Sequence, residues 1–405
     1  MAVSAVYNTA FAHGIVTSFS VPTSQIWSST GTGGGTLSVS SSINRRTGGF
    51  SLDINKTSSS STTVFCYKNL TAANKWAVRF YVYFQSLPAS TTRIFTIEDS
   101  VLSNHFKMSV TSNKLAVGFT AGGADTASTT TITTGVWYRV DLQIDVSANQ
   151  FSCNWQIDGV AQTSSTPTFT AGTLDRLVFG VSSNSTTTLR FNFTDVILSN
   201  TLGDYPIGPG LGYYALPTSM GTHVNSGRFQ NGDGTAVGSG TPALLADWPP
   251  IATGGNTDYL KQVTADGVGE SSYIEIKNVQ EASLAVFNAV TAYLAYTSNT
   301  TASNNGGCVV RRTDGTEITV FGSDSSLADY SDGSITSWRF SQALVTAPSG
   351  GWTQAELNAL LFRCGYATDV TPNPYWGALL IEYDAVIPPP PIKTIRTAVG
   401  RAANW

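Results

Sequence analysis

The sequence predicts an all-β protein built of two β-sandwich, jelly-roll-like domains, the second carrying one short α-helix. Short apolar runs alternate with polar residues and are separated by polar turns, which is typical of sandwiches. Charged residues make up 12% of the chain, well below the usual share, so Ser and Thr take many outward strand positions. The 38 Gly and 16 Pro supply many turns, and 405 residues suffice for two cores.

The clearest predicted element is an antiparallel hairpin over 135–159, formed by two alternating runs around a short turn. Strict alternation indicates strands with one buried and one wet face. We therefore expect Asp141, Gln143 and Asp145 to face water. The inward positions are Val140, Leu142, Ile144, Val146, Phe151, Cys153, Trp155 and Ile157.

The hairpin belongs to a first sandwich that we place over 36–205. Residues 1–35 form an N-terminal extension of small residues, and the Gly-Thr-Gly-Gly-Gly at 31–35 predicts a flexible hinge. A cluster of Gly and Pro near 205 marks the domain boundary. Further alternating runs predict strands at 50–54, 78–84, 93–98, 105–110, 115–119, 177–181 and 190–198.

The second half is predicted to contain an arm and a second sandwich. Residues 206–260 carry few periodic runs, so we expect an irregular arm lying on a neighbouring surface. The second sandwich spans 261–387. Within it, Thr353 and Glu356 form a capping box that predicts a helix near 354–364. Alternating runs lie at 273–277 and 290–296.

Residues 388–405 read as a Pro-rich linker followed by a docking tail. Four consecutive prolines, 388–391, form a stiff spacer. The tail beyond them carries basic but no acidic side chains, with apolar residues at helical spacing. Terminal segments become ordered where they are held down, so we expect this tail to dock on a neighbouring subunit. The candidate docking residues are Ile392, Ile395, Arg396, Val399, Arg401 and Trp405.

Charge and hydropathy exclude two classes of partner. The net charge is −4, and no basic patch is present to neutralise phosphates, so we expect no nucleic-acid binding. The N-terminal residues lack a basic region followed by an apolar run, which argues against a signal peptide. No apolar stretch approaches about 18 residues, so we expect no membrane insertion.

The residue patterns of common catalytic sites are missing. The three histidines form no zinc motif, and neither a GxSxG elbow nor a phosphate-binding loop occurs. Glycosidases on jelly rolls need two converging carboxylates. Glu382 and Asp384 share one strand face, but we interpret them as residues on the wet face of an edge strand. We predict that the protein is not an enzyme.

We expect no cofactor, with calcium as the remaining alternative. Oxygen-rich loops bind calcium, and a Gly- and Ser-rich stretch contains Asp324, Asp329 and Asp332. Their spacing matches no EF-hand, and Asp in loops is ordinary turn chemistry. The four cysteines, Cys66, Cys153, Cys308 and Cys364, are interpreted as buried thiols, with a disulfide or a metal site as alternatives.

Aromatic residues outside the predicted core are candidates for contact with a carbohydrate or with a partner protein. Tyr81 and Tyr83 lie on the strand face opposite the core, and Tyr213, Tyr214 and Trp248 fall in the arm. Aromatic rings stack on sugars, but burial against a partner is their commoner use, and we favour burial.

The sequence resembles two kinds of known protein. Residues of about 35–200 look like a laminin-G-like or concanavalin A-like lectin domain, on the evidence of 48–52, the 135–159 hairpin and 195–198. Three later segments are similar to structural proteins of tailed-bacteriophage virions, of the minor tail protein type. These segments are 203–210, 352–358 and 377–383.

This resemblance implies a component of the virion. We expect it in the tail in preference to the capsid, and we expect it to be synthesised in the host cytoplasm. Its expected partners are other virion proteins, copies of itself and host-surface glycans touched by the lectin-like domain. Two alternatives remain open. One is a capsid decoration protein, and the other is a carbohydrate-active enzyme.

Overall fold

The structure is a computed structural model, and its description covers most of both predicted sandwiches. The described residues are 5–9, 28–30, 35–46, 49–57, 62–99, 105–120, 122–168, 170–185, 187–222, 229–246, 259–262, 273–278, 286–298, 307–322, 330–331, 334–335, 338–365 and 374–386.

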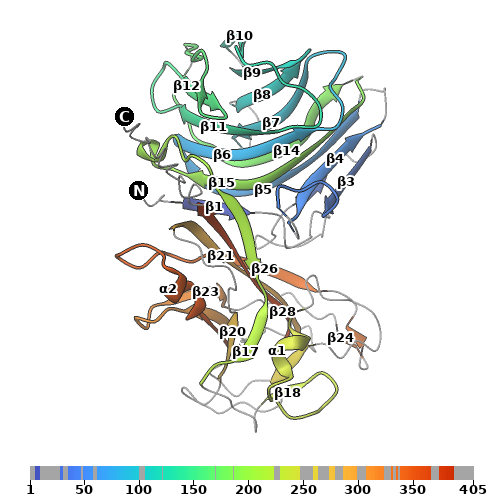
Figure 1. The fold of residues 1–405 in the computed structure, drawn as a ribbon, viewed down its shortest axis with the longest axis vertical. Helices are drawn as coiled ribbons and strands as arrows, with labels where there is room; N and C mark the ends of the chain where they lie inside the picture. Colours follow the sequence, from blue (N-terminus) through green and yellow to red (C-terminus); the bar gives the residue numbers. More distant parts are fainter. Residues whose placement is uncertain are drawn as a thin grey trace, which may run out of the picture.

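The first sandwich consists of an eight-stranded and a seven-stranded sheet within these residues (Figure 1). The eight-stranded sheet has the order β13 (Val160–Ala161), β12 (Ser152–Ile157), β11 (Trp137–Asp145), β6 (Lys75–Phe84), β15 (Leu189–Ser199), β4 (Ser51–Lys56) and β3 (Gly35–Ser40), with β1 (Ala5–Thr9) paired to β15. The seven-stranded sheet has the order β10 (Gly122–Ala127), β9 (Lys114–Phe119), β8 (His105–Thr111), β7 (Thr92–Glu98), β14 (Leu174–Ser185), β5 (Thr62–Ala73) and β2 (Ser28–Thr30).

The predicted hairpin is confirmed, and it contributes to one large core between these two sheets. Leu142 of β11 lies opposite Trp155 of β12 in an antiparallel register, and both are buried. Phenylalanines from both sheets fill the middle of the core, where the ring centroids of Phe80 and Phe95 are 4.7 Å apart. The outward face of the hairpin is not uniformly wet, because Asp141 is 0% exposed.

The second sandwich pairs a six-stranded with a five-stranded sheet within the described residues (Figure 1). The six-stranded sheet has the order β18 (Phe229–Asn231), β19 (Leu260–Gln262), β28 (Pro374–Val386), β21 (Val286–Ser298) and β26 (Arg339–Leu344), with β16 (Leu211–Ala215) also paired to β28. The five-stranded sheet has the order β17 (Pro217–Met220), β20 (Tyr273–Asn278), β27 (Leu361–Gly365), β22 (Gly307–Arg311) and β23 (Glu317–Phe321). The remaining described elements are the β24–β25 pair (Tyr330–Ser331 and Ser334–Ile335), the 3-10 helix η2 (Leu202–Asp204), α1 (Thr241–Leu244) and α2 (Gln354–Asn358). Both sandwiches confirm the predicted fold class.

The two central strands of the six-stranded sheet, β21 and β28, are buried on both faces. One face carries residues such as Leu294 and Leu379, which belong to the core of the second sandwich. The other face carries Tyr293 and Leu380, which join the core cluster of the first sandwich. Strands buried on both faces are expected to be mainly apolar, and these two strands are apolar at most positions, with polar exceptions such as Asn288, Glu382 and Asp384. The sheet therefore packs against both its own partner sheet and the first sandwich.

Several segments are more regular than their composition predicts. Within the extension at 1–35, β1 and β2 pair with β15 and β5 of the first sandwich. The segment 206–260, predicted to be an irregular arm, instead supplies β16, β17, β18 and the start of β19 to the second sandwich. These strands are short, so they carry too few alternating residues to be visible as a pattern.

The predicted helix near 354–364 is real but shorter. Its start is correct, because the Thr353 side chain accepts a hydrogen bond from the Glu356 amide at 3.1 Å, as a capping box requires. The helix α2 ends at Asn358, and β27 begins at Leu361. Leu357 therefore lies in the helix, whereas Leu361 is the first residue of a strand. No helix in the described part of the chain is long and apolar enough to cross a membrane.

The buried histidine of β8 makes stability depend on pH. His105 is 7% exposed, and neither ring nitrogen has a hydrogen-bond partner in the described structure. Burial, aided by the cations Arg93 and Lys107, lowers the pKa of His105 from 6.5 to about 4. The folded protein therefore holds this imidazole neutral at pH values where the unfolded chain protonates it.

We expect the free energy of unfolding to fall as the pH drops from 6.5 to about 4, by up to about 3 kcal/mol from this residue. Urea titrations at a series of pH values measure the effect. The His105→Gln variant should lose this part of the pH dependence. If the free energy of unfolding fell equally with pH in the variant and in the parent protein, His105 would not be the cause of this pH dependence.

Candidate functional site

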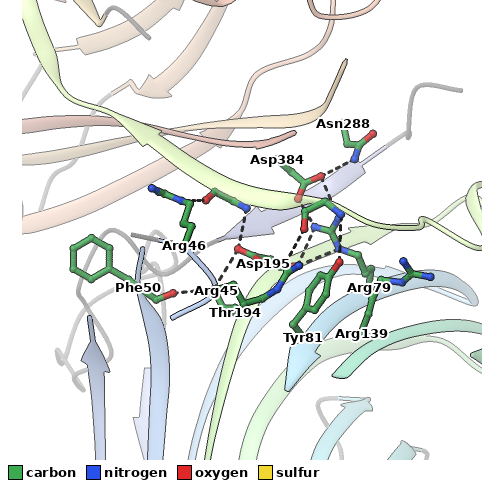
Figure 2. A network of polar contacts seen from close by, with 12 residues as sticks. Arg45, Arg46, Phe50, Arg79, Tyr81, Arg139, Thr194, Asp195, Asn288 and Asp384 are labelled. Atoms are coloured by element: carbon green, nitrogen blue, oxygen red, sulfur yellow. Dashed lines mark hydrogen bonds and ion pairs between the residues drawn. The ribbon is translucent and has the colours of Figure 1, made fainter. Parts of the chain in front are cut away.

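A network of polar residues lies between the two sandwiches, and Arg79 is at its centre (Figure 2). Arg79 projects from the outer face of β6 and is 0% exposed. Its guanidinium forms an ion pair with Asp384 of β28 and donates to the Asp195 carbonyl oxygen at 3.0 and 3.2 Å. A buried charge is tolerable only when it is paired and hydrogen-bonded, so this contact fixes how the two sandwiches meet.

Asp384 is shared by several strands. Besides Arg79, its carboxylate accepts a hydrogen bond of 2.6 Å from the Asn288 side-chain amide of the neighbouring β21. It is 2% exposed. Both oxygens of the carboxylate therefore accept hydrogen bonds from buried side chains, Arg79 and Asn288.

Asp195 forms the second acidic point of the network. It lies at an irregularity in the pairing of β15 with β6, with φ of 50°, and is 4% exposed. Its carboxylate binds Arg45 and accepts the Gly212 amide at 2.8 Å. Burial raises the pKa of Asp195, and the charges of Arg45 and Arg79 oppose this shift. Asp195 of the first sandwich therefore binds the backbone near the start of β16.

The connection between the domains is threaded through the same network. The Gly208 amide donates to Asp141 at 2.9 Å, which explains why Asp141 of the hairpin is buried. Arg139 in turn binds the other oxygen of Asp141 at 2.8 Å. A Cβ on Gly210 would collide with Arg79 and Asp384, so the connection requires glycine at this position. The linker is therefore packed into the contact region between the two sandwiches, which we call the joint.

Three of the predicted contact aromatics line this joint. Tyr81 is 5% exposed, and the Arg45 guanidinium lies 3.2 Å above its ring centroid. Tyr213 is part-buried, with its ring stacked on Tyr383 at 5.5 Å, and Tyr214 is part-buried beside Phe50. These contacts are all made within one chain, whereas the sequence favoured burial against a partner protein, and that expectation stays a prediction.

Apolar residues seal the joint around the polar network. Ala77 of β6 and Ile197 of β15 form a cluster with Ile207 of the linker and Ala289 of β21. Tyr293 of β21 is 0% exposed and donates its hydroxyl to Glu382 at 2.9 Å. Water is excluded from these contacts, which strengthens the electrostatic interactions inside them.

The interpretation of Glu382 and Asp384 as residues on a wet edge strand is wrong. They are 0% and 2% exposed, and β28 is a central strand of its sheet. The two carboxylates face the first sandwich. Arg79 of that sandwich binds Asp384, and Tyr293 of the neighbouring strand β21 binds Glu382. Arg79 and Asp195 were not among the residues predicted to form a site. One signal was available, since a charged residue within an apolar strand has to find a partner when it is buried.

Among the predicted contact aromatics that the structure describes, Tyr83 lies outside the joint. It is part-buried on the outer face of β6, and its ring centroid lies 5.3 Å from that of Trp137, its register partner on β11. Asn192 lies opposite Tyr83 on the other neighbouring strand, and it is bonded to Gln85 at 2.8 Å. We call Tyr83, Trp137, Gln85 and Arg190 the rim platform.

The rim platform carries balanced charge. Arg190, whose side chain is 44% exposed, forms an ion pair with Asp53 at 2.6 Å. Asp53 is the register partner of Asn192, so its carboxylate side of the ion pair lies in the same row of the sheet as the two rings, with Arg190 two residues from Asn192 along β15. Trp137 was not among the predicted contact residues, although it lies at the start of the hairpin predicted over 135–159.

The other predicted site residues lie outside the described residues. These are Trp248, the calcium candidates Asp324, Asp329 and Asp332, and the docking residues Ile392, Ile395, Arg396, Val399, Arg401 and Trp405. Across the described ranges, no group of three or more His, Cys, Asp or Glu side chains is arranged to hold a metal ion.

Comparisons with known proteins give similarities of fold to parts of the chain. No family model matches, and no curated protein matches. Among solved structures, a sialidase is 13% identical over 50% of this chain with a TM-score of 0.35, and the match covers 19% of that sialidase. The cellulose-induced protein Cip1 is 12% identical over 48% of this chain and 97% of its own, with a TM-score of 0.37. The carbohydrate-binding module CBM66 from Bacillus subtilis is 11% identical over 46% of this chain and 99% of its own, with a TM-score of 0.28.

We expect Arg79→Met to destabilise the protein by about 3–5 kcal/mol, because the substitution leaves Asp384 buried without its cation. Arg190→Met is the matched control, since that arginine is 44% exposed and its ion pair should contribute about 0–1 kcal/mol. Urea unfolding followed by tryptophan fluorescence measures both. Similar losses for the two variants would argue against Arg79 as the centre of the joint.

Proposed function

We propose that the protein is a non-catalytic adhesion component that binds uncharged glycans at the rim platform. The observation that carries the proposal is the pairing of Tyr83 and Trp137 on the outer face of the eight-stranded sheet. Their rings are part-buried and fixed in register on neighbouring strands, so a sugar ring can stack on them without ordering a loop first.

Polar groups beside the two rings suit sugar hydroxyls. Gln85 and Arg190 lie at the adjoining end of β6 and on β15, and both supply hydrogen-bond donors. The charge of Arg190 is balanced by Asp53, and that of Arg139 by Asp141. A surface with paired charges offers little to an anionic ligand, which favours a neutral glycan over a sialylated or phosphorylated one.

The carboxylates that a glycosidase mechanism would use support the non-catalytic part of the proposal. Glu382 and Asp384 are buried in the joint, with their oxygens engaged by Tyr293, Arg79 and Asn288. Retaining and inverting glycosidases need two carboxyl groups that flank a sugar in a cleft. The burial of this pair removes it as a candidate acid and nucleophile.

We further propose that the chain acts as a structural protein of a tailed-phage virion, in the tail in preference to the capsid. The support is the sequence similarity of 203–210, 352–358 and 377–383 to minor tail proteins. Two of these segments, 203–210 and 377–383, run through or beside the joint between the sandwiches. A firm joint suits a building block that must present a binding face at a set distance from its particle.

The glycan proposal predicts that Tyr83→Ala and Trp137→Ala each weaken binding at least tenfold, which corresponds to about 1.4 kcal/mol. An array of neutral and acidic bacterial-surface glycans identifies the ligand, and calorimetry with the best oligosaccharide measures affinity. The matched control is Tyr67→Ala, because Tyr67 lies on β5 of the other sheet with Arg176 over its ring. Absence of neutral-glycan binding, or equal binding by all variants, would refute the platform.

The virion proposal is tested separately by purifying phage particles from host cells that produce this chain, probing them for the chain and imaging them. We expect copies arranged in threefold or sixfold rings around the tail axis. Copies at lattice positions on the shell would instead indicate a capsid decoration protein. Absence from the particle would reject both virion roles and leave the glycan result standing on its own.

A further inference from the structure

Two of the four cysteines lie side by side in the second sandwich. Cys308 is on β22 and Cys364 is on β27, and the antiparallel register places them directly opposite each other. Both are 0% exposed, and their sulfur atoms are 3.5 Å apart. Both thiols are free in this structure.

This arrangement is close to that of a disulfide. Opposite residues on antiparallel strands have Cβ atoms about 4.5–5.5 Å apart, and disulfides span Cβ separations of about 3.5–4.5 Å. The two sulfurs already point toward each other, so bond formation needs small rotations of two side chains and a slight approach of β22 to β27. No strand has to change register.

The surroundings determine when the bond can form. Cys308 and Cys364 belong to the apolar core of the second sandwich, together with Val310 and Phe362 of the same strands. Burial raises the pKa of the Cys308 thiol well above its usual value, so the reactive thiolate is scarce in the folded protein. Oxidation therefore competes with burial, and it takes place while the second sandwich is still assembling.

We propose that Cys308 and Cys364 form a cross-strand disulfide when the chain folds in the presence of a disulfide oxidant such as oxidised glutathione. The two thiols lose two protons and two electrons as the sulfur–sulfur bond forms, and one glutathione disulfide is reduced to two glutathione thiols. A chain folded under reducing conditions retains the two thiols in its core. This inference is independent of the glycan proposal.

The bond would close a long loop within the second sandwich. It joins residues 56 positions apart, so it closes a loop that contains β23, β26 and α2. Closing a long loop restricts the unfolded chain and stabilises the folded one. The effect on the first sandwich is small, because its cysteines are separate. Cys66 lies on β5 and Cys153 on β12, which belong to different sheets.

The experiment refolds the full chain from denaturant, once with a reduced and oxidised glutathione mixture and once with dithiothreitol. Monomers are then denatured, labelled with a maleimide and digested without reduction. We expect two labelled thiols after oxidative refolding and four after reductive refolding, with one cross-linked peptide pair joining Cys308 to Cys364. Oxidative refolding should raise the melting temperature of the second sandwich by roughly 5 °C or more.

Cys308→Ala is the test variant, and Cys66→Ala is the matched control, because both remove a buried thiol. The control should keep the cross-linked pair and the rise in melting temperature, and the test variant should lose both. Four labelled thiols in the oxidatively refolded parent protein would overturn the proposal. So would a cross-link that joins Cys66 to Cys153 in place of Cys308 to Cys364. Because the labelling is read on the parent protein, the conclusion stands even where a variant folds poorly.

Discussion

The guanidinium of Arg79 is the contact on which the arrangement of the two sandwiches depends. It is fully buried, and its bonds go to Asp384 of the second sandwich and to the backbone of Asp195 in the first. A buried ion pair contributes little net free energy, because the cost of removing both charges from water offsets their attraction. Its effect is on orientation. A packing of the two domains that buried Arg79 away from Asp384 would leave a charge buried without a partner.

Apolar burial supplies the driving force for the same joint. Tyr293 and Leu380 of the second sandwich enter the core cluster of the first, and Ile207 of the linker packs with Ile197 of β15 and Ala289 of β21. The linker itself is fixed by Asp141 and by the close approach of Gly210 to Arg79. The apolar and the polar contacts therefore have different effects. Hydrophobic surface holds the domains together, and the polar network selects one geometry among those that bury similar area.

The joint also determines which surface remains for binding. The second sandwich covers Arg79 and Tyr81 on the outer face of β6, whereas Tyr83, two residues further along, stays part-exposed beside Trp137. The rim platform is therefore continuous with the joint. A ligand held there would contact a sheet that is buttressed on its core side by the seven-stranded sheet and on its outer side by the second sandwich. Such support keeps the two rings in place without loop ordering.

The sequence by itself determined the all-β class, the 135–159 hairpin and the start of α2. Alternation and helix capping depend only on residues that are close together in the chain, so they are visible in the sequence. The sequence did not determine which part of the protein covers the outward face of a strand. Alternation marks Arg79 and Asp384 as outward, but they meet across 305 positions of chain. Only the tertiary structure placed them together, because burial of an outward face depends on a domain that is distant in sequence. For the same reason, the short strands of 206–260 became visible only through the longer strands that they pair with.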